Sequence, residues 1–488
     1  MASNPSNLEV AEVEDAHLSR WRRSNPFVQN LVVALALFCN PGLYLTITSL
    51  GAGGGRPSSA DMANLSNALC YAAFVFSGLA APTILNRAGP RLTLMVAITG
   101  YPVFIGAMWY FDAHGHLWFP AVAGLILGVA GGLLWATAAF VANGYSEESN
   151  RGTWRSIQWT SNVTGATVGG CVALGINWNA NSLGVPHSVY IVFICIQLAS
   201  LSLGFFMLPP DRLRRNDGTS IAEFHPHTPF MKSLKGTLRL FKDPKILIMI
   251  PAFFTAEMFF PLMATVNAFA FNLRTRTLNS MLGNAIQIPL TLGMGWLLDN
   301  EKFGSRKRRG FIAITFNAVY ITGAYIALIV WLKSWNFQWT VPGPSIDCTD
   351  DAYPGAVVVY LLMVSQYGIF QNVMIWVFGS FTNDPENSAH ISGLFIACIS
   401  AGTSISFATS STEQPFINVA GAFFALTTLC WPILGFVVWK YTSDTRYFQE
   451  ETVTVPLHVR KEKGMDVHVG TAGSSIDVSS TAVDKVDR

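Results

Sequence analysis

Charged residues are scarce in this chain. They make up 12% of its 488 residues, whereas soluble domains carry roughly 25%. The formal net charge is only +2, so bulk charge gives no reason to expect nucleic acid or an acidic partner. The seven cysteines show neither metal-ligand spacing nor a disulfide framework. A Gly-x-Ser-x-Gly motif, a phosphate-binding loop and a Cys/His cluster are missing, so we expect no enzyme, no cofactor and no metal site.

Apolar residues, by contrast, make up 51% of the chain. They gather in twelve stretches, each long enough to cross a bilayer as a helix, which takes about 20 residues. The expected fold is therefore all-α, a polytopic membrane protein whose first partner is the lipid bilayer. Three of the stretches are relatively polar, but the loop charges alternate only if all are kept. The predicted helices are 27–50, 62–85, 91–111, 117–144, 153–177, 187–208, 246–272, 279–298, 310–332, 354–381, 388–411 and 415–441.

Lys and Arg in the loops orient the chain, because short cytoplasmic loops carry an excess of them. With the N-terminus in the cytoplasm, the inner loops hold Arg87 and Arg91, Arg151 and Arg155, and two longer basic blocks. We therefore expect an integral, multi-pass protein with both termini cytoplasmic. The charge pattern is the same for a plasma membrane and for an internal membrane. The outer loops hold only Arg56, Arg274, Arg276 and Lys333.

The longest inner loop divides the chain into two six-helix halves. Leu and Phe are interleaved with Lys and Arg between residues 230 and 245, which predicts either an amphipathic helix on the inner membrane surface or a solvated linker helix. The end of the chain lacks apolar periodicity, so we expect it to be disordered. The predicted organisation is a cytoplasmic segment at 1–26, a first half at 27–208, a cytoplasmic linker at 209–245, a second half at 246–441 and a disordered cytoplasmic tail at 442–488.

A weak repeat relates the two halves. After the second predicted helix the chain reads Asn86-Arg-Ala-Gly-Pro-Arg91, and after the eighth Asp299 is followed by a glycine and a basic run. Both segments resemble the loop after helix 2 of the major facilitator superfamily, with Asn86 in place of that loop's acidic residue. The resemblance implies the major facilitator fold, with two parallel six-helix halves. It also implies a gating loop that latches the two halves, built here on Arg87, Gly89, Arg91, Asp299 and Gly304.

A narrower resemblance covers about residues 27–445. It rests on the segments 40–50, 71–89, 131–135, 148–152, 271–276 and 379–384, which are similar to the fungal form of the Unc-ninety-three-like family, a branch of that superfamily. Members of this family include regulators of ion channels, trafficking chaperones of receptors and fungal proteins of unknown substrate. The resemblance therefore implies the fold more strongly than the activity.

One acidic residue, Glu257, lies near the middle of the seventh predicted helix. A lone carboxylate near the bilayer centre costs about 2.5–3.5 kcal/mol, and such residues usually face the bundle interior or a water-filled path. Removal from water favours the neutral form of a carboxyl group, so Glu257 could load and release protons or bind a cation. The alternative is a structural acid, hydrogen-bonded to a neighbouring helix. Pro251 and Pro261 flank it and permit this helix to bend.

Small residues mark predicted packing surfaces. Gly124, Gly128 and Gly132 form two overlapping Gly-x-x-x-Gly steps in the fourth predicted helix, and Gly165 and Gly169 form another in the fifth. Such steps let two helix backbones approach closely.

Amide side chains on several helices complete the predicted path. Buried amides either line a polar cavity or join helices through hydrogen bonds worth about 0.6 kcal/mol. Asn40 precedes Pro41 and Gly42 halfway along the first predicted helix, which indicates either a local unwinding or a plain kink. Trp135 and Trp159 lie deeper than an interfacial belt, so they either stack on a substrate or pack. The predicted substrate or proton path consists of Glu257, Asn40, Gln158, Asn162, Asn284, Gln287, Gln366 and Gln371.

Two hypotheses of different class follow. The first is a secondary transporter that moves a small molecule by alternating access without ATP, with protons as the candidate coupling ion and export of organic metabolites as one direction. The second is a facilitator-fold accessory or trafficking protein that regulates another membrane protein or ion channel and transports nothing. Buried acidity separates the two, since proton-driven transporters often carry several buried charges. This chain has one clear case, Glu257.

Overall fold

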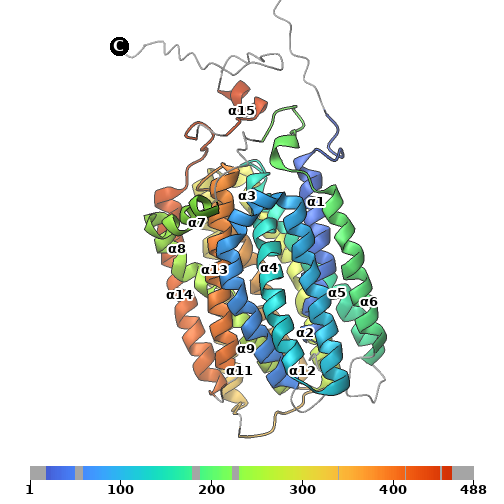
Figure 1. Ribbon diagram of the computed structural model, residues 1–488. Coiled ribbons are helices and arrows are strands. Elements are labelled where there is room, and N and C mark those ends of the chain that lie inside the picture. The colour runs from blue at the N-terminus through green and yellow to red at the C-terminus, as the bar shows by residue number, and fades with distance from the viewer. Residues whose placement is uncertain are drawn as a thin grey trace, which may run out of the picture.

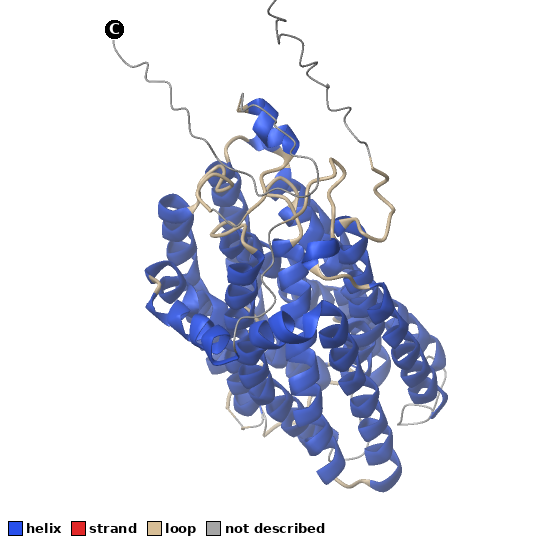
Figure 2. Cartoon of the chain, turned by 45° about the horizontal axis from the view of Figure 1, so that its top comes forward, coloured by secondary structure: helices blue, strands red, loops and turns tan. Residues whose placement is uncertain are grey.

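The computed structural model describes residues 18–49, 59–177, 187–221, 230–450 apart from 339, 411 and 413, and 453–463. Within these ranges the chain forms helices and loops, with two isolated β-bridges. The long helices stand side by side as a bundle, and the short helices α7 and α15 lie at the same end of it (Figure 1). Figure 2 brings that end forward and draws no strand in the described part of the chain. The all-α prediction is confirmed.

The first half of the bundle contains six membrane crossings. Two of them belong to one long helix, α3, whose backbone departs from helical geometry at Gly89, where φ is 73°. The first crossing is built from two helices with a π-helical turn, Phe38–Gly42, between them. The elements of this half are α1 (Pro26–Leu37), α2 (Leu43–Ser49), α3 (Ser59–His114), α4 (Trp118–Gly144), α5 (Arg151–Asn177) and α6 (His187–Ala199), which continues as a 3₁₀ helix (Ser200–Phe206).

The second half repeats this pattern. Its crossings are α8 (Pro244–Thr255) with α9 (Phe259–Ala270), α10 (Leu273–Asp299), α11 (Arg306–Ser334), α12 (Tyr353–Gly379), α13 (Pro385–Ser410) and α14 (Phe416–Tyr441). Outside the crossings lie α7 (Phe230–Arg239), α15 (Leu457–Glu462) and the 3₁₀ turns Pro210–Arg212, Leu240–Lys242 and Glu301–Phe303.

The number of crossings agrees with the twelve expected. Ten segments of the described chain are helical, long and apolar enough to span a membrane. One of them is 53 residues long and holds both crossings of α3. The remaining crossing is α5, a helix of 27 residues whose arginines and amides lower its hydropathy.

The seventh crossing is broken, which corrects the continuous helix predicted over 246–272. α8 ends at Thr255, α9 begins at Phe259, and Glu257 lies in the turn between them. Pro261 explains the break, because it has no N–H to donate to the carbonyl four residues earlier, that of Glu257. This carbonyl instead accepts a hydrogen bond from the Phe260 N–H at 3.0 Å. The acidic side chain is thus carried by an irregular turn in the bundle.

Two helices begin earlier than predicted, and four arginines that were counted with the loops lie in helices, Arg155 already within the predicted span 153–177. α5 begins at Arg151, so Arg151 and Arg155 lie inside the bundle, each 2% exposed. α10 begins at Leu273, so Arg274 and Arg276 belong to its first turn. That turn is held by Asn272, whose side chain accepts from the Thr275 N–H, and by an ion pair of 2.5 Å between Arg274 and Asp347.

Close backbone contacts join the helices, as the glycine steps predict. A Cβ on Gly128 of α4 would overlap the Cys70 carbonyl of α3, and one on Gly165 of α5 would overlap the Phe38 carbonyl. The two halves meet where α3 packs on α13 and where α5 packs on α10. At the second of these contacts, a Cβ on Gly295 would lie only 2.8 Å from the Gly152 carbonyl oxygen.

We call one end of the bundle the basic end. It comprises the bend of α3 at 86–90, the segments 145–150, 207–221, 240–243, 300–305 and 380–384, α7, and the described residues after 441. Part of the segment predicted as a tail contacts the bundle: Tyr447 is buried, and Glu450 accepts from the Asn383 N–H at 2.7 Å. Residues 1–17 and 464–488, which belong to the predicted terminal segments, lie outside the described residues.

α7 lies against the bundle at the basic end. Its buried Ser233 bonds with Thr83 of α3 at 3.2 Å, and its buried Thr237 bonds with the His390 ring of α13 at 2.8 Å. Met231 and Leu238 are exposed. Polar contacts toward the protein and apolar side chains directed outward suit an amphipathic helix at a membrane surface, the first of the two alternatives for this segment.

Candidate functional site

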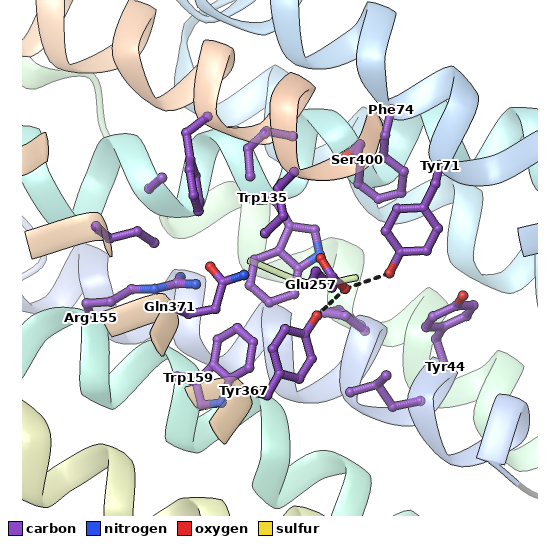
Figure 3. A pocket seen from close by; sticks show the side chains of 17 residues that line it. Tyr44, Tyr71, Phe74, Trp135, Arg155, Trp159, Glu257, Tyr367, Gln371 and Ser400 are labelled. Carbon is purple, nitrogen blue, oxygen red and sulfur yellow. Dashed lines mark hydrogen bonds between the residues drawn. The ribbon is translucent and has the colours of Figure 1, made fainter. Parts of the chain in front are cut away.

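A cavity lies between the two halves of the bundle, and we call it the central cavity. Its lining is mostly apolar and aromatic with a few polar groups among them, which is the usual composition of small-molecule sites. Figure 3 shows Glu257 in the middle of this space, Arg155 and Gln371 on one side of it, and Tyr71 and Tyr44 on the other. Helices of both halves supply its lining, which includes Pro41, Tyr44, Tyr71, Trp135, Arg155 and Trp159 from the first half and Glu257, Tyr367, Gln371, Phe395 and Ser400 from the second.

Glu257 is held by a tyrosine from each half. Its side chain is 6% exposed. Its Oε1 atom accepts a hydrogen bond of 2.9 Å from the Tyr71 hydroxyl of α3 and a second, short one from the Tyr367 hydroxyl of α12. No cation lies within ion-pair distance of this carboxyl group among the described residues. The group therefore links the two halves through hydroxyl donors alone.

Arg155 is the second ionisable group of the central cavity, and sequence reasoning missed it by placing it in a loop. Its guanidinium carbon lies 5.5 Å from the Trp135 ring and 5.3 Å from the Trp159 ring, where cation–π attraction operates. Nη1 donates to Gln158 Oε1 at 3.2 Å. The missed signal is helical spacing: Arg155, Gln158, Trp159 and Asn162 recur at i, i+3, i+4 and i+7 on one face of α5.

Aromatic rings form much of the wall. Trp159 lies 5.8 Å from Trp135 and 4.5 Å from Tyr367, measured between ring centroids. Its indole N–H donates to Gln287 Oε1 at 3.0 Å, which fixes the ring orientation across the two halves. Both tryptophans therefore line the cavity and also pack, so the two alternatives for them are not exclusive.

A second, outer cavity lies between helices of both halves. It shares Leu45 and Tyr367 with the central cavity. Its polar lining comes mainly from the half of α10 remote from the basic end. That lining includes Thr48, Asn267, Arg276, Ser280, Asn284 and Gln287.

The structure brings only some of the predicted path residues to these cavities. Glu257 and Gln371 line the central one, and Asn284 and Gln287 line the outer one. Whether any of them forms a path stays a prediction. Among the described residues, no group of three or more His, Cys, Asp or Glu could hold a metal ion. Four predicted residues line neither cavity: Asn40, Gln158, Asn162 and Gln366.

The hydrogen bonds of those residues explain where they lie. Asn40 donates to the Ala36 carbonyl and to Ser200 Oγ at 2.9 Å, which joins the first crossing to the sixth. Gln158 donates to Asn30 Oδ1 at 2.8 Å and to a carbonyl of α4. Gln366 donates to the Met363 carbonyl of its own helix at 2.8 Å. Asn40 and Gln158 thus join helices, the second of the two roles that intramembrane amides take. Gln366 bonds within its own helix, and the buried Asn162 Oδ1 has no partner among the described residues.

Charged side chains join the two halves at the basic end, and we call this cluster of Glu148, Arg151, Arg306 and Asn383 the basic-end latch. Arg306 of the second half lies 3.3 Å from Glu148 of the first, and the two side chains are 2% and 9% exposed. Arg151 of the first half donates to the Gly379 carbonyl and, at 2.6 Å, to Asn383 Oδ1. Burial alone would raise the pKa of Glu148, but the charges of Arg306 and Arg151 and a hydrogen bond from Asn383 lower it below its ordinary value. Glu148 is therefore ionised at neutral pH.

The two predicted gating segments behave differently. Asp299 of the second half accepts from the Gly152 N–H at 2.9 Å and from the Thr153 N–H at 2.5 Å, so it caps α5 of the first half. Gly304, beyond it, has a φ of 98°. In the first-half copy, Arg87 is exposed, and Arg91 lies 4.9 Å over the Phe205 ring of its own half. Among the hydrogen bonds of the described residues, those of Asp299 reach from one half to the other.

Solved structures of similar architecture define the class of fold. The proton:xylose symporter XylE, of the major facilitator superfamily, superposes with a TM-score of 0.59 at 14% identity, over 87% of this chain and 97% of that one. A bacterial homologue of the iron transporter ferroportin in an outward-facing state gives a TM-score of 0.61 at 12% identity, over 85% and 100%. The chain has the major facilitator fold.

Sequence comparison then places the chain within that superfamily. The family described as ion channel regulatory protein UNC-93 matches residues 60–297. An uncharacterized membrane protein of Schizosaccharomyces pombe is 36% identical over 391 residues, 80% of each chain. UNC93-like protein 1 of Arabidopsis thaliana is 29% identical over 435 residues, 87% of this chain and 93% of that one. The chain belongs to the UNC-93 family, as its sequence resemblance indicated.

A further relative carries a different kind of name. Notoamide biosynthesis cluster protein O′ of Aspergillus versicolor is 26% identical over 405 residues, which cover 82% of this chain and 86% of that protein. Fold and family together indicate an integral, multi-pass membrane protein.

Proposed function

We propose that this protein is a secondary transporter, which moves a small organic molecule across the membrane by alternating access without ATP. The observation that carries the proposal is the central cavity, enclosed between the two halves and containing Glu257 held by Tyr71 of one half and Tyr367 of the other. In facilitator folds, substrate and coupling-ion sites lie near the bilayer midplane at the interface of the repeats.

Closure at one end fits such a cycle. The latch holds the halves together at the basic end, while the outer cavity extends from the central one toward the opposite end. We take the basic end to face the cytoplasm, because inner loops carry the excess of Lys and Arg. Release of the latch, with closure of the halves around the outer cavity, would then expose the central cavity to the cytoplasm.

Glu257 supplies a way to couple protons to this motion. A carboxylate is a stronger hydrogen-bond acceptor than a neutral acid. Protonation of Glu257 would therefore weaken its hydrogen bonds from Tyr71 and Tyr367. The bond from Tyr71 is the one that joins the two halves at the cavity. Proton loading in this way lowers the cost of separating the halves. The relative named for a biosynthesis cluster favours an organic metabolite as cargo and export as the direction.

A second candidate function follows from the family itself, whose description is ion channel regulatory protein. On this reading the protein binds another membrane protein, moves nothing, and Glu257 is a structural acid. The two readings differ in whether the cavity opens to both sides of the membrane.

Cysteine accessibility tests this difference without knowledge of the substrate. Ser400 of α13 lines the central cavity, whereas Ser392, two turns away on the same helix, is buried and lines neither cavity. Each is replaced by cysteine in a background without the seven native cysteines, and an impermeant thiol reagent is added to right-side-out or inverted vesicles. A transporter predicts labelling of Ser400→Cys from both faces and of Ser392→Cys from neither. Labelling of Ser400→Cys from a single face would favour the accessory reading.

A further inference from the structure

We infer that the central cavity binds an organic monoanion, a carboxylate on a ring-sized apolar body, and that Arg155 holds the carboxylate. The inference rests on the proposed function and deepens it by naming the class of cargo. Among the described residues, the Arg155 guanidinium has no counter-ion.

Arg155 is a buried cation without a counter-ion. Its side chain is 2% exposed, and no carboxylate lies within ion-pair distance of it among the described residues. The bond from Nη1 to Gln158 is the one hydrogen bond its guanidinium makes within the described chain, and Nε is buried without a partner. A buried charge left unpaired is strongly destabilising. A ligand anion would supply the missing partner.

The guanidinium is also held in position and directed at the cavity. The Trp135 and Trp159 rings flank it, and Gln158 is fixed by its own bonds to Asn30 and the Ala138 carbonyl, so that its oxygen faces Arg155. In Figure 3 the Gln371 amide lies on the same side of the cavity as Arg155. Gln371 is 3% exposed, and its side chain makes no hydrogen bond to a described residue. A planar guanidinium beside a free amide suits the two oxygens of a carboxylate.

The second charged group of the cavity decides the sign of the cargo. The groups that face Glu257 are the Tyr71 and Tyr367 hydroxyls, with the Cys70 thiol and the Tyr44 hydroxyl nearby. None of these is cationic, so Arg155 is the one positive charge in the lining of the cavity. Once Glu257 takes up a proton, the cavity carries a net positive charge, which an anion neutralises and a cation would double. Charge interactions are strong in such a dry space, so binding of the proton and of the anion should reinforce each other.

The walls select the body of the ligand. Beyond Arg155, Gln371 and Glu257, the lining is dominated by apolar and aromatic side chains, among them Phe74, Phe395 and Ile399. These surfaces offer few hydrogen bonds to a polyhydroxylated molecule, and they suit a flat ring. The cavity thus combines one anion-binding end with walls that are largely apolar and aromatic.

Matched ligands of different charge test the inference on the purified full-length protein. The first series is phenylacetate, phenylacetamide and phenethylammonium, and the second is 1-naphthylacetate with its amide and amine. Binding is read as a rise in unfolding temperature. We expect stabilisation by the acids at millimolar concentration and at least tenfold weaker binding of the amides and amines. Equal stabilisation by amide and acid, preference for the amine, or no stabilisation by either acid would overturn the inference.

Variants tie the preference to Arg155. Arg155→Gln should remove the preference for the acid, and Arg155→Lys should weaken acid binding at least tenfold, because a point charge replaces a planar fork. Arg20→Gln, at an exposed arginine that also lies over an aromatic ring, is the matched control and should bind the acids as the parent does. Retained acid preference in Arg155→Gln would overturn the assignment. If Arg155→Gln does not fold, protection of Ser400→Cys from labelling by the acid, but not by its amide, replaces this measurement.

Failure of this inference and failure of the transport proposal give different results. Acid binding that depends on Arg155, without flux of the acid into proteoliposomes, would leave the ligand class standing and count against transport. Flux of the amide or amine, with none of the acid, would leave transport standing and overturn the ligand class.

Discussion

Neutralising Glu148 should open the basic end of the protein. In Glu148→Gln the side chain keeps an oxygen that can accept from Asn383 Nδ2 and from the Arg446 N–H, which now bond at 2.8 and 3.0 Å. What it loses is the charge opposite Arg306, 3.3 Å away. Both side chains are largely buried, so solvent does not weaken this ion pair as it weakens exposed pairs.

The size of the effect follows from the burial of this pair. Removing one partner of a buried ion pair costs about 3–5 kcal/mol, because the other charge is left uncompensated. The amide of Glu148→Gln retains part of the hydrogen bonding, so we take about 3 kcal/mol. Glu148 and Arg306 belong to different halves, so the whole cost falls on the closed arrangement. Since each 1.4 kcal/mol is a factor of ten, the equilibrium between closed and open should shift about 100-fold toward open.

Spin labels at Arg87 and Lys307, which are exposed at the basic end of opposite halves, measure this shift. Electron–electron double resonance should show a longer distance between the two labels in Glu148→Gln, and this distance should be rare in the parent. Glu147→Gln is the control, because Glu147 is 25% exposed and pairs with Arg215 of the linker at 3.8 Å; its distances should match those of the parent. A Glu148→Gln distribution indistinguishable from the parent's would refute the latch.

Three further predictions follow from the same contacts. The latch should hold at neutral pH and down to the ordinary glutamate pKa of 4.5. It should weaken only as pH falls through the lowered pKa of Glu148, because protonation removes the charge of that side chain. The distances between the same spin labels, measured against pH, check this. Gly295→Ala should destabilise the closed protein by about 1–3 kcal/mol through overpacking, because its Cβ would lie 2.8 Å from the Gly152 carbonyl, and an unchanged melting temperature would contradict it. Tyr71→Phe should lower the free energy of unfolding by about 1.5–3 kcal/mol if the Tyr71 hydroxyl donates to a charged Glu257. The same substitution should lower it by clearly less in a Glu257→Gln background. Equal losses in this double-mutant cycle would show that the hydrogen bond contributes little.

The fold could be predicted because the bilayer imposes strict demands on a sequence. Each crossing needs about 20 apolar residues with all backbone groups bonded internally, and both requirements are visible along the chain. Even α5, the most polar crossing, is recovered by the alternation of loop charge. The break at Glu257 could also have been predicted, since Pro261 lies four residues beyond it and has no N–H to donate to the Glu257 carbonyl.

The site was less predictable because its residues are assigned by contacts between helices. Arg155 is assigned to a loop when the basic residues of the chain are counted to orient it. Its burial in a cavity is visible only from its contacts with the Trp135 and Trp159 rings. The amides present the same difficulty. Gln158 and Gln371 look alike in sequence, but Asn30 engages the first, and no described residue bonds to the second. A single sequence does not show which partner another helix will bring.

Proton-driven flux in proteoliposomes tests the central claim most directly. The purified protein is reconstituted, a pH gradient is imposed, and uptake of labelled phenylacetate or 1-naphthylacetate is followed for the parent and for Glu257→Gln. Liposomes without protein, measured in parallel, correct for diffusion of the neutral acids through the lipid. We predict protein-dependent uptake that rises with the gradient in the parent and loses this dependence in Glu257→Gln, although the variant folds. Uptake in the parent no greater than in protein-free liposomes, or an identical gradient response in Glu257→Gln, would contradict the account.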